Sequence, residues 1–121
     1  MLKDKLYQII SLHRSNDAVV IIEIYPDHKI FSGHFPGQPV LPGACVLQIL
    51  KEILTEITDT PVRLKRADQI KFLSLIDPQV NNVLEFKISW SRAEDQLLHV
   101  TASIIADKVV SVKFKGTFLV L

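Results

Sequence analysis

The sequence predicts an α+β domain in which an antiparallel sheet is wrapped around one long helix. Two observations carry this prediction. Segment 43–58 is apolar except for one polar stripe at helical spacing, and residues 84–120 alternate apolar and polar side chains with period two. A helix this apolar must be mostly covered, and the apolar face of the sheet supplies the cover by curling around it.

Composition narrows the classes of protein that fit. The chain has 121 residues, of which 48% are hydrophobic, so we expect a single domain over residues 1–121 with a substantial core. The net charge of +1, without a basic run interleaved with aromatics, argues against nucleic acid and acidic membranes as partners. The N-terminal segment lacks the apolar core of a signal peptide, and no apolar run reaches the roughly 18 residues of a membrane span. We therefore expect a cytoplasmic protein.

The first elements are an expected helix and a strand. Residues 2–12 carry apolar side chains at roughly helical spacing, which predicts a short amphipathic helix. These side chains are Leu2, Leu6, Ile9, Ile10 and Leu12. The polar segment 14–17 indicates a turn, and the apolar, β-branched segment 18–25 predicts a largely buried strand that Pro26 ends.

The long helix is expected over 43–58, with Pro61 closing the segment. Its polar residues fall at i, i+3, i+4, i+7 and i+8, which is one stripe on a helix. They are Gln48, Lys51, Glu52, Thr55 and Glu56. The first turn after Gly43 is entirely apolar.

The rest of the chain predicts strands. Segment 62–73 is the first, and a turn follows near 77–82. Three alternating segments then form a meander with one apolar face. The expected inward side chains are Leu84, Phe86, Ile88, Trp90, Leu98, Val100, Ala102, Ile104, Val110, Val112, Phe114, Phe118 and Val120.

A loop rich in glycine and proline precedes the long helix. Within 31–48 it holds Gly33, Gly37 and Gly43 together with Pro36, Pro39 and Pro42. Prolines fix φ and glycines reach backbone conformations closed to other residues, so this loop is built to hold one shape. A stiff loop, one ionisable side chain (His34) and a helix N-terminus in one stretch indicate a site rather than a connection.

The segment Gly33-His34-Phe35-Pro36-Gly37, followed by Pro39-Val40 and Pro42-Gly43, resembles the signature of the hot-dog-fold 3-hydroxyacyl-acyl-carrier-protein dehydratases. A weaker likeness extends to residues 27–31 and to Lys71-Phe72. The resemblance implies a hot-dog fold, an acyl thioester substrate, acyl carrier protein as a partner, and a dimer with a sheet continuous across two chains.

The resemblance also implies roles for two groups. In the family the motif histidine, here His34, works at C2 of the substrate, which suits a side chain whose pKa lies near neutrality. The thioester oxygen accepts from an amide matching Gly43, and helix N-termini do carry unpaired N–H groups. Alternatively, His34 only hydrogen-bonds the loop in place, and Gly43 only lets the loop enter the helix.

Gln48 stands where the family has a Glu or Asp as general acid. An amide cannot be a general acid, although it can donate a hydrogen bond or hold a water. Gln48 also fits as the first member of the helix's polar stripe. Three replacements for the acid remain open: Glu52, which is otherwise expected to be solvated or paired with Lys51 or Lys65; a water held by Gln48; or a carboxylate from an acid-bearing paralogue in a heterodimer.

Further residues are candidates for substrate contact. By the resemblance these are Phe31, Gly33, Phe35, Pro42 and Ala44, and the apolar tunnel is expected to include Phe31, Phe35, Val40 and Leu41. Each of the apolar side chains also fits an ordinary core position.

The remaining titratable side chains do not indicate a second catalytic or ligand-binding site. Cys45, the one cysteine, is expected to be a small buried hydrophobe. His99 is expected on an exposed strand face, and His13 and His28 in turn regions. No spacing suits a metal and no Gly-rich phosphate loop follows a strand, so we expect no metal and no nucleotide cofactor.

The resemblance therefore implies a protein of the 3-hydroxyacyl-acyl-carrier-protein dehydratase type, acting on or binding acyl thioesters in fatty acid or related lipid or polyene synthesis. One alternative is a non-catalytic hot-dog subunit that binds acyl chains or the carrier protein, which Gln48 favours. The other is an acyl thioesterase. A homodimer is expected, with the heterodimer as the alternative assembly.

Overall fold

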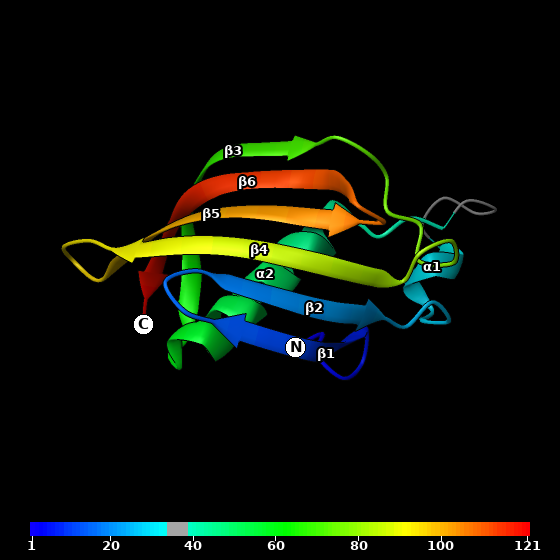
Figure 1. Cartoon of the computed structure of the whole chain (residues 1–121), viewed down its shortest axis with the longest axis horizontal. Helices are drawn as coiled ribbons and strands as arrows, with labels where there is room; N and C mark the ends of the chain where they lie inside the picture. The colour runs from blue at the N-terminus through cyan, green and yellow to red at the C-terminus, as the bar shows by residue number, and fades with distance from the viewer. Residues whose placement is uncertain (34–38) are drawn as a thin grey trace.

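The computed structural model describes residues 1–33 and 39–121. Within these residues, six strands form one antiparallel sheet in the order β1-β2-β4-β5-β6-β3 (Figure 1). The strands are β1 (Tyr7–Arg14), β2 (Ala18–Ile24), β3 (Val62–Phe72), β4 (Val83–Arg92), β5 (Leu97–Ala106) and β6 (Val109–Val120). The two helices are α1 (Ile30–Gly33) and α2 (Gly43–Thr58).

Helix α2 lies against the concave face of the sheet, and its bounds are the predicted ones (Figure 1). It starts directly after Pro42, whose fixed φ of −63° is compatible with a helix start, and ends at Asp59, which adopts the left-handed conformation with φ 55°. The Arg14 guanidinium donates to the carbonyl of Ile57 and so satisfies a free C-terminal carbonyl of the helix.

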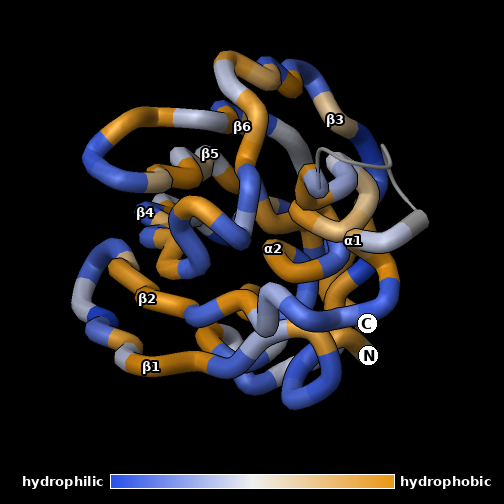
Figure 2. Tube along the Cα trace, turned by 90° about the vertical axis from the view of Figure 1, so that its right-hand side faces the viewer, coloured by the Kyte–Doolittle hydropathy of each residue, from blue (hydrophilic) through white to orange (hydrophobic). Residues whose placement is uncertain are grey.

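The meander of β4, β5 and β6 is confirmed, and its apolar face supplies the cover for α2 (Figure 2). The inward residues Leu84, Phe86, Ile88, Leu98, Val100, Ala102, Ile104, Val112, Phe114 and Phe118 are all buried, and Trp90, Val110 and Val120 are half-buried. Apart from Val110, they pack on one side of the sheet with Val46, Ile49, Leu50, Ile53, Leu54 and Ile57 of the helix. Val110 lies at the register shift between Ile104 and Ile105, where Ser111 is buried instead. This arrangement leaves the other face of the sheet to solvent.

The predicted N-terminal helix is wrong, because residues 7–14 form strand β1 against β2. A tight turn forms before the strand, in which the amide of Leu6 donates to the carbonyl of Leu2 at 2.8 Å, but Asp4 within it has a positive φ of 66°, so the turn is not helical. A register shift between Ile9 and Ser11 then breaks the alternation of the strand. Side chains on either side of such a bulge imitate helical spacing.

The expected strand 62–73 is β3, but it pairs with β6 at the far edge of the sheet rather than with a sequence neighbour. Helix α1 adds a short turn in the segment expected to be a loop. In the part of the chain that the structure describes, no helix is long and apolar enough to cross a membrane.

Candidate active site

In the sequence, the Gly-His-Phe-Pro motif comes between α1 and α2. Gly33 is the last residue of α1, whereas His34 and Phe35 lie outside the described residues. The chain is described again from Pro39, and Val40 and Leu41 are buried as they approach α2. The amide of Leu41 donates to the carbonyl of Ile76 at 2.8 Å, which ties this approach to the segment after β3.

Two amides at the N-terminus of α2 have no acceptor among residues 1–33 and 39–121. The amides of Cys45 and Val46 donate to the carbonyl of Pro42 at 2.9 and 3.2 Å. No described residue accepts from the amides of Gly43 or Ala44, and no side chain caps this end of the helix. Such amides carry the partial positive charge of a helix N-terminus and suit an oxygen that gains negative charge.

An apolar pocket of about 280 Å³ opens beside Gly43. Its walls come from the approach to α2, the helix itself, the end of β3 with the segment that follows it, and β6. They are formed by Val40, Leu41, Gly43, Val46, Phe72, Ser74, Leu75, Ile76 and Val112. The ring of Phe72 lies so close to Gly43 that a Cβ added there would be 2.8 Å from its Cζ atom. A ligand whose thioester oxygen accepts from the Gly43 amide could therefore place its acyl chain in this apolar pocket.

The predicted contact residues divide between this pocket and other places. Val40 and Leu41 line the pocket as expected. Phe31 does not, because it is 5% exposed in the core with its ring edge against His28 at a centroid distance of 6.5 Å. Pro42 is the residue before the helix and Ala44 is exposed in its first turn.

Gln48 is not part of the pocket lining. Its side-chain nitrogen donates to Oε2 of Glu52 at 2.8 Å, one helical turn further on. Within the described residues of one chain, Gly43 and Gln48 are therefore not brought together around the same cavity.

Glu52 is neither solvated nor paired with Lys51 or Lys65, and that expectation is wrong. It is 4% exposed and accepts hydrogen bonds from Tyr7, Gln48 and the amides of residues 2 and 3. Burial acts to raise the pKa of Glu52, but these hydrogen bonds together hold the pKa below its usual value. The N-terminal segment supplies three of the donors, and its misassignment as a helix is why the sequence did not reveal this environment.

The other titratable side chains are mostly where they were expected. Cys45 is buried, and burial raises the pKa of its thiol. His28 lies in a turn, and His99 is exposed on β5 with Nδ1 3.2 Å from Oγ1 of Thr117. His13 is in β1 rather than in a turn.

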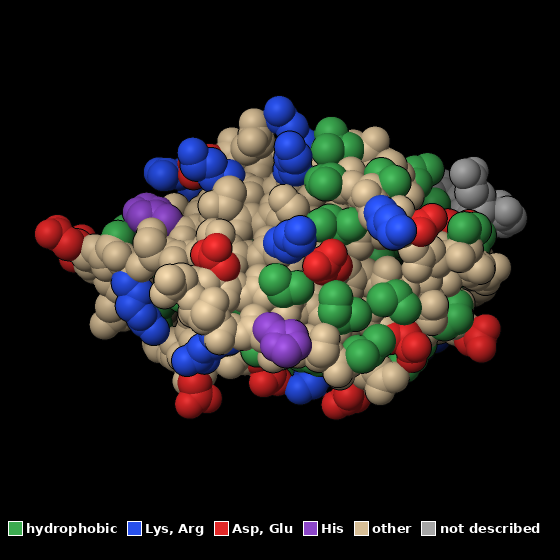
Figure 3. Space-filling view, viewed as in Figure 1, with side chains coloured by type: hydrophobic (Ala, Val, Ile, Leu, Met, Phe, Trp, Pro, Cys, Tyr) green, Lys and Arg blue, Asp and Glu red, His purple; other side chains and the backbone are tan. Residues whose placement is uncertain are grey.

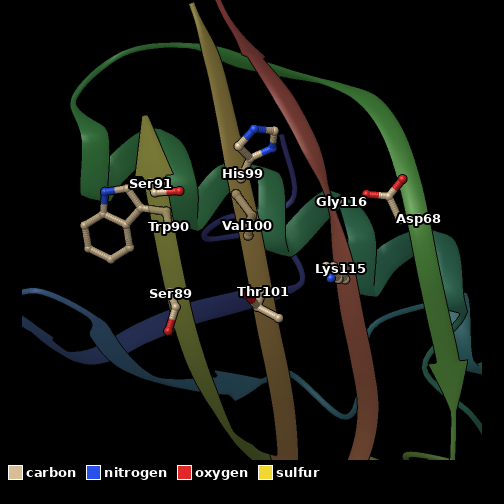
Figure 4. Close-up of a pocket in the computed structure, with 9 residues that line it drawn as sticks. All are labelled: Asp68, Ser89, Trp90, Ser91, His99, Val100, Thr101, Lys115 and Gly116. Atoms are coloured by element: carbon tan, nitrogen blue, oxygen red, sulfur yellow. The ribbon is translucent and has the colours of Figure 1, made fainter. Parts of the chain in front are cut away.

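A second hollow, of about 330 Å³, lies on the outer face of the sheet. Its lining is mainly polar and includes Asp68, Ser89, His99, Thr101 and Lys115 (Figure 4). The surrounding face carries scattered charges of both signs together with hydrophobic side chains (Figure 3). Trp90 and Val100 also line this hollow, but the residues around it belong to strands, so it offers no amides of a helix N-terminus. No cluster of three metal-ligating side chains occurs in the described ranges 1–33 and 39–121.

Comparison with known protein families identifies the family of this chain. Residues 11–115 match the model of the ApeI-like family, described as ApeI dehydratase. The chain belongs to this family. The ApeI-like match agrees with the resemblance to hot-dog dehydratases that the Gly-His-Phe-Pro motif carries.

Two curated relatives are 3-hydroxyacyl-[acyl-carrier-protein] dehydratases FabZ. The one from Lactococcus lactis is 29% identical over 112 residues, which cover 87% of this chain and 73% of the relative. The one from Syntrophobacter fumaroxidans is 23% identical over 82 residues, which cover 61% of this chain and 56% of the relative. The chain thus matches little more than half the length of the second relative.

A solved structure shares the fold of this ApeI-like chain. It is the dehydratase heterocomplex ApeI:P from Xenorhabdus doucetiae, with a TM-score of 0.72 and 21% identity over 92% of this chain and 96% of that chain. The predicted hot-dog fold, a sheet wrapped around one central helix, is confirmed.

Proposed function

We propose that this chain binds 3-hydroxyacyl thioesters as a protein of the 3-hydroxyacyl-acyl-carrier-protein dehydratase type. The observation that carries the proposal is that Gly43, whose amide has no acceptor among the described residues, lines an apolar pocket at the start of α2. The thioester oxygen would accept from the Gly43 amide while the acyl chain lies among Val40, Leu41 and Val46. Membership of the ApeI-like family and the FabZ relatives support the same substrate class.

Dehydration would then proceed by loss of a proton from C2 and of the hydroxyl from C3. His34, the histidine of the family motif, is the proposed base at C2. The Gly43 amide stabilises the negative charge that develops on the thioester oxygen, a contribution worth about 10²–10³ in rate for one such donor in other enzymes. His34 would hold the C2 proton, the departing C3 hydroxyl would take a proton from an acid and leave as water, and a C2–C3 double bond would form. Return of the proton from His34 to the acid would restore the site.

The acid for the departing hydroxyl is the open part of this mechanism. Glu52 is a poor candidate, because its four hydrogen bonds favour the ionised form. A water held by Gln48, or a carboxylate from a partner subunit, would fill the role.

We propose an acid-bearing paralogue as that partner when the chain is catalytic, with a homodimer as the other assembly. The heterocomplex formed by the solved relative supports the first of these. Acyl carrier protein is the proposed carrier of the thioester, and the cytoplasm the proposed location.

A second candidate function is a non-catalytic subunit that binds acyl thioesters. Gln48 favours it, because a carboxamide supplies no acidic proton and its NH₂ group is already donated to Glu52. An acyl thioesterase is supported by the shared fold alone.

Mass spectrometry of a short 3-hydroxyacyl carrier-protein thioester would separate these functions, with the wild type, His34→Ala and Gln48→Glu compared in both reaction directions. Turnover by the wild type that His34→Ala abolishes supports the dehydratase. A silent wild type with an active Gln48→Glu variant supports a site that lacks only its proton donor. Binding without turnover in all three variants supports the non-catalytic subunit, and neither binding nor turnover contradicts the proposal.

A further inference from the structure

Glu52 is a buried carboxylate that the proposed chemistry does not use. Its Oε1 accepts from the Tyr7 hydroxyl at 3.0 Å and from the Lys3 amide at 2.9 Å. Its Oε2 accepts from the Leu2 amide at 2.9 Å and from Nε2 of Gln48 at 2.8 Å. The two ion pairs among the described residues, Lys3–Glu56 and Arg66–Asp68, do not include it. Hydrogen bonds rather than a cation therefore stabilise its charge.

An ionised carboxylate only accepts hydrogen bonds, so it fixes which way Gln48 turns. The NH₂ group of Gln48 must face Glu52, and the carbonyl oxygen then faces away. We propose that Glu52 is a positioning residue that holds the Gln48 side-chain oxygen outward, as an acceptor for a water or for the hydroxyl of a 3-hydroxyacyl chain that lies in the pocket of a partner subunit. The identity of this ligand rests on the proposed function, whereas the orientation of Gln48 does not.

The group around Glu52 is pre-organised. Tyr7 is fully buried, and burial together with the Glu52 charge raises the pKa of its phenol, which stays protonated and donates. The two amides come from a closed turn, in which the Asp4 amide donates to the Tyr7 carbonyl at 2.6 Å. Turning the Gln48 oxygen toward Glu52 would bring two acceptors together in a buried site, so the observed orientation is strongly preferred.

An acceptor at position 48 has a consequence for selectivity. A 3-hydroxyacyl thioester can donate its hydroxyl proton to Gln48, whereas a saturated acyl thioester of the same length cannot. A hydrogen bond of this kind should favour the hydroxylated ligand on the order of threefold to tenfold. The preference should depend on Glu52 although Glu52 itself does not touch the ligand.

The orientation is testable by the side-chain amide signals of Gln48 in nuclear magnetic resonance. The chain provides two references, the surface pair Gln8–Glu23, with its 2.9 Å hydrogen bond, and the exposed Gln69. We expect the Gln48 amide protons to exchange with water at least about tenfold more slowly than those of either reference. Glu52→Gln should shift the Gln48 signals and speed their exchange, and Tyr7→Phe, which removes a donor from the other oxygen of Glu52, should leave them close to wild type.

Exchange as fast as that of Gln69 would overturn the proposal, as would unchanged Gln48 signals in a folded Glu52→Gln protein. If Glu52→Gln fails to fold, the exchange rates of the wild-type amide protons alone test the orientation of Gln48.

The ligand is tested by comparing Kd values for 3-hydroxyoctanoyl-pantetheine and octanoyl-pantetheine in a His34→Ala background, where no thioester is consumed. A preference for the hydroxylated ligand that Gln48→Met removes supports the proposal, and equal Kd values overturn it. If neither thioester binds, the proposed function fails and the ligand assigned to Gln48 fails with it, while the exchange rates still decide the orientation.

Discussion

The side-chain nitrogen of Gln48 lies 2.8 Å from Oε2 of Glu52, so the residue at the acid position of the family motif is held by a buried carboxylate one helical turn away. This contact explains why Gln48 is half-buried rather than part of a solvated stripe. It also determines how the site should respond when an acid is restored.

Gln48→Glu should place two carboxyl groups side by side in a buried site. They cannot both ionise at this distance, so the pKa of one of them rises. Relative to the wild type, the free energy of unfolding of Gln48→Glu should therefore fall as pH rises through that raised pKa, with a loss of about 1–3 kcal/mol at pH 8. The other charged or titratable groups near the pair are Tyr7, Lys3, Asp4 and Glu56. Urea unfolding across pH 5–9 is the measurement.

Gln8→Glu is the matched control for this substitution, because Gln8 donates to Glu23 in an exposed pair. Solvent screens like charges there, and the cost should stay within about 0.5 kcal/mol. Equal losses of unfolding free energy in Gln48→Glu and Gln8→Glu would show that the burial of Glu52 does not increase the cost of a second carboxylate.

Glu52 should also govern the acid stability of the wild type. Its folded pKa is lowered from the ordinary value of 4.5, so its stabilising effect is fully present above that value and is lost as pH falls through the folded pKa. The difference in unfolding free energy between the wild type and Glu52→Gln should therefore shrink as pH is lowered from about 6 to 3. Glu56→Gln, which breaks the exposed Lys3–Glu56 pair, should change stability by less than about 1 kcal/mol throughout. A difference that is constant with pH would contradict the lowered pKa.

Gly43 and Phe72 should be coupled. A methyl group added at Gly43 meets the Phe72 ring, which is 56% exposed and free to swing aside, so Gly43→Ala should alter stability by less than about 1 kcal/mol. The same methyl group enters the pocket beside the free amides and should weaken thioester binding. Phe72→Leu makes room and should restore part of the affinity in the double variant. Titration calorimetry with octanoyl-pantetheine measures the binding free energy of the wild type, the two single variants and the double variant. Additive effects of the two substitutions on this free energy would argue that the methyl group and the ring do not compete.

The sequence predicted the central helix and the meander because each has a long, regular hydrophobic period. It did not predict β1, because a bulge near Ile9 disturbed the alternation and one turn at Leu2–Leu6 resembled the start of a helix. That error concealed the environment of Glu52, whose donors come from the same segment. The pocket was predicted only in part: Val40 and Leu41 follow from the motif, whereas Phe72, Ile76 and Val112 reach it through the pairing of β3 with β6. No local pattern reveals a pairing between strands so distant in the chain.

If the pocket at the start of α2 receives the acyl thioester, the binding of octanoyl-pantetheine should be visible in the amide and methyl chemical shifts of its lining. We expect saturable shifts at Gly43, Val46, Ile76 and Val112, with little change at Ser89, His99 and Lys115 around the outer hollow. Shifts confined to the outer hollow, or none at any thioester concentration, would contradict it.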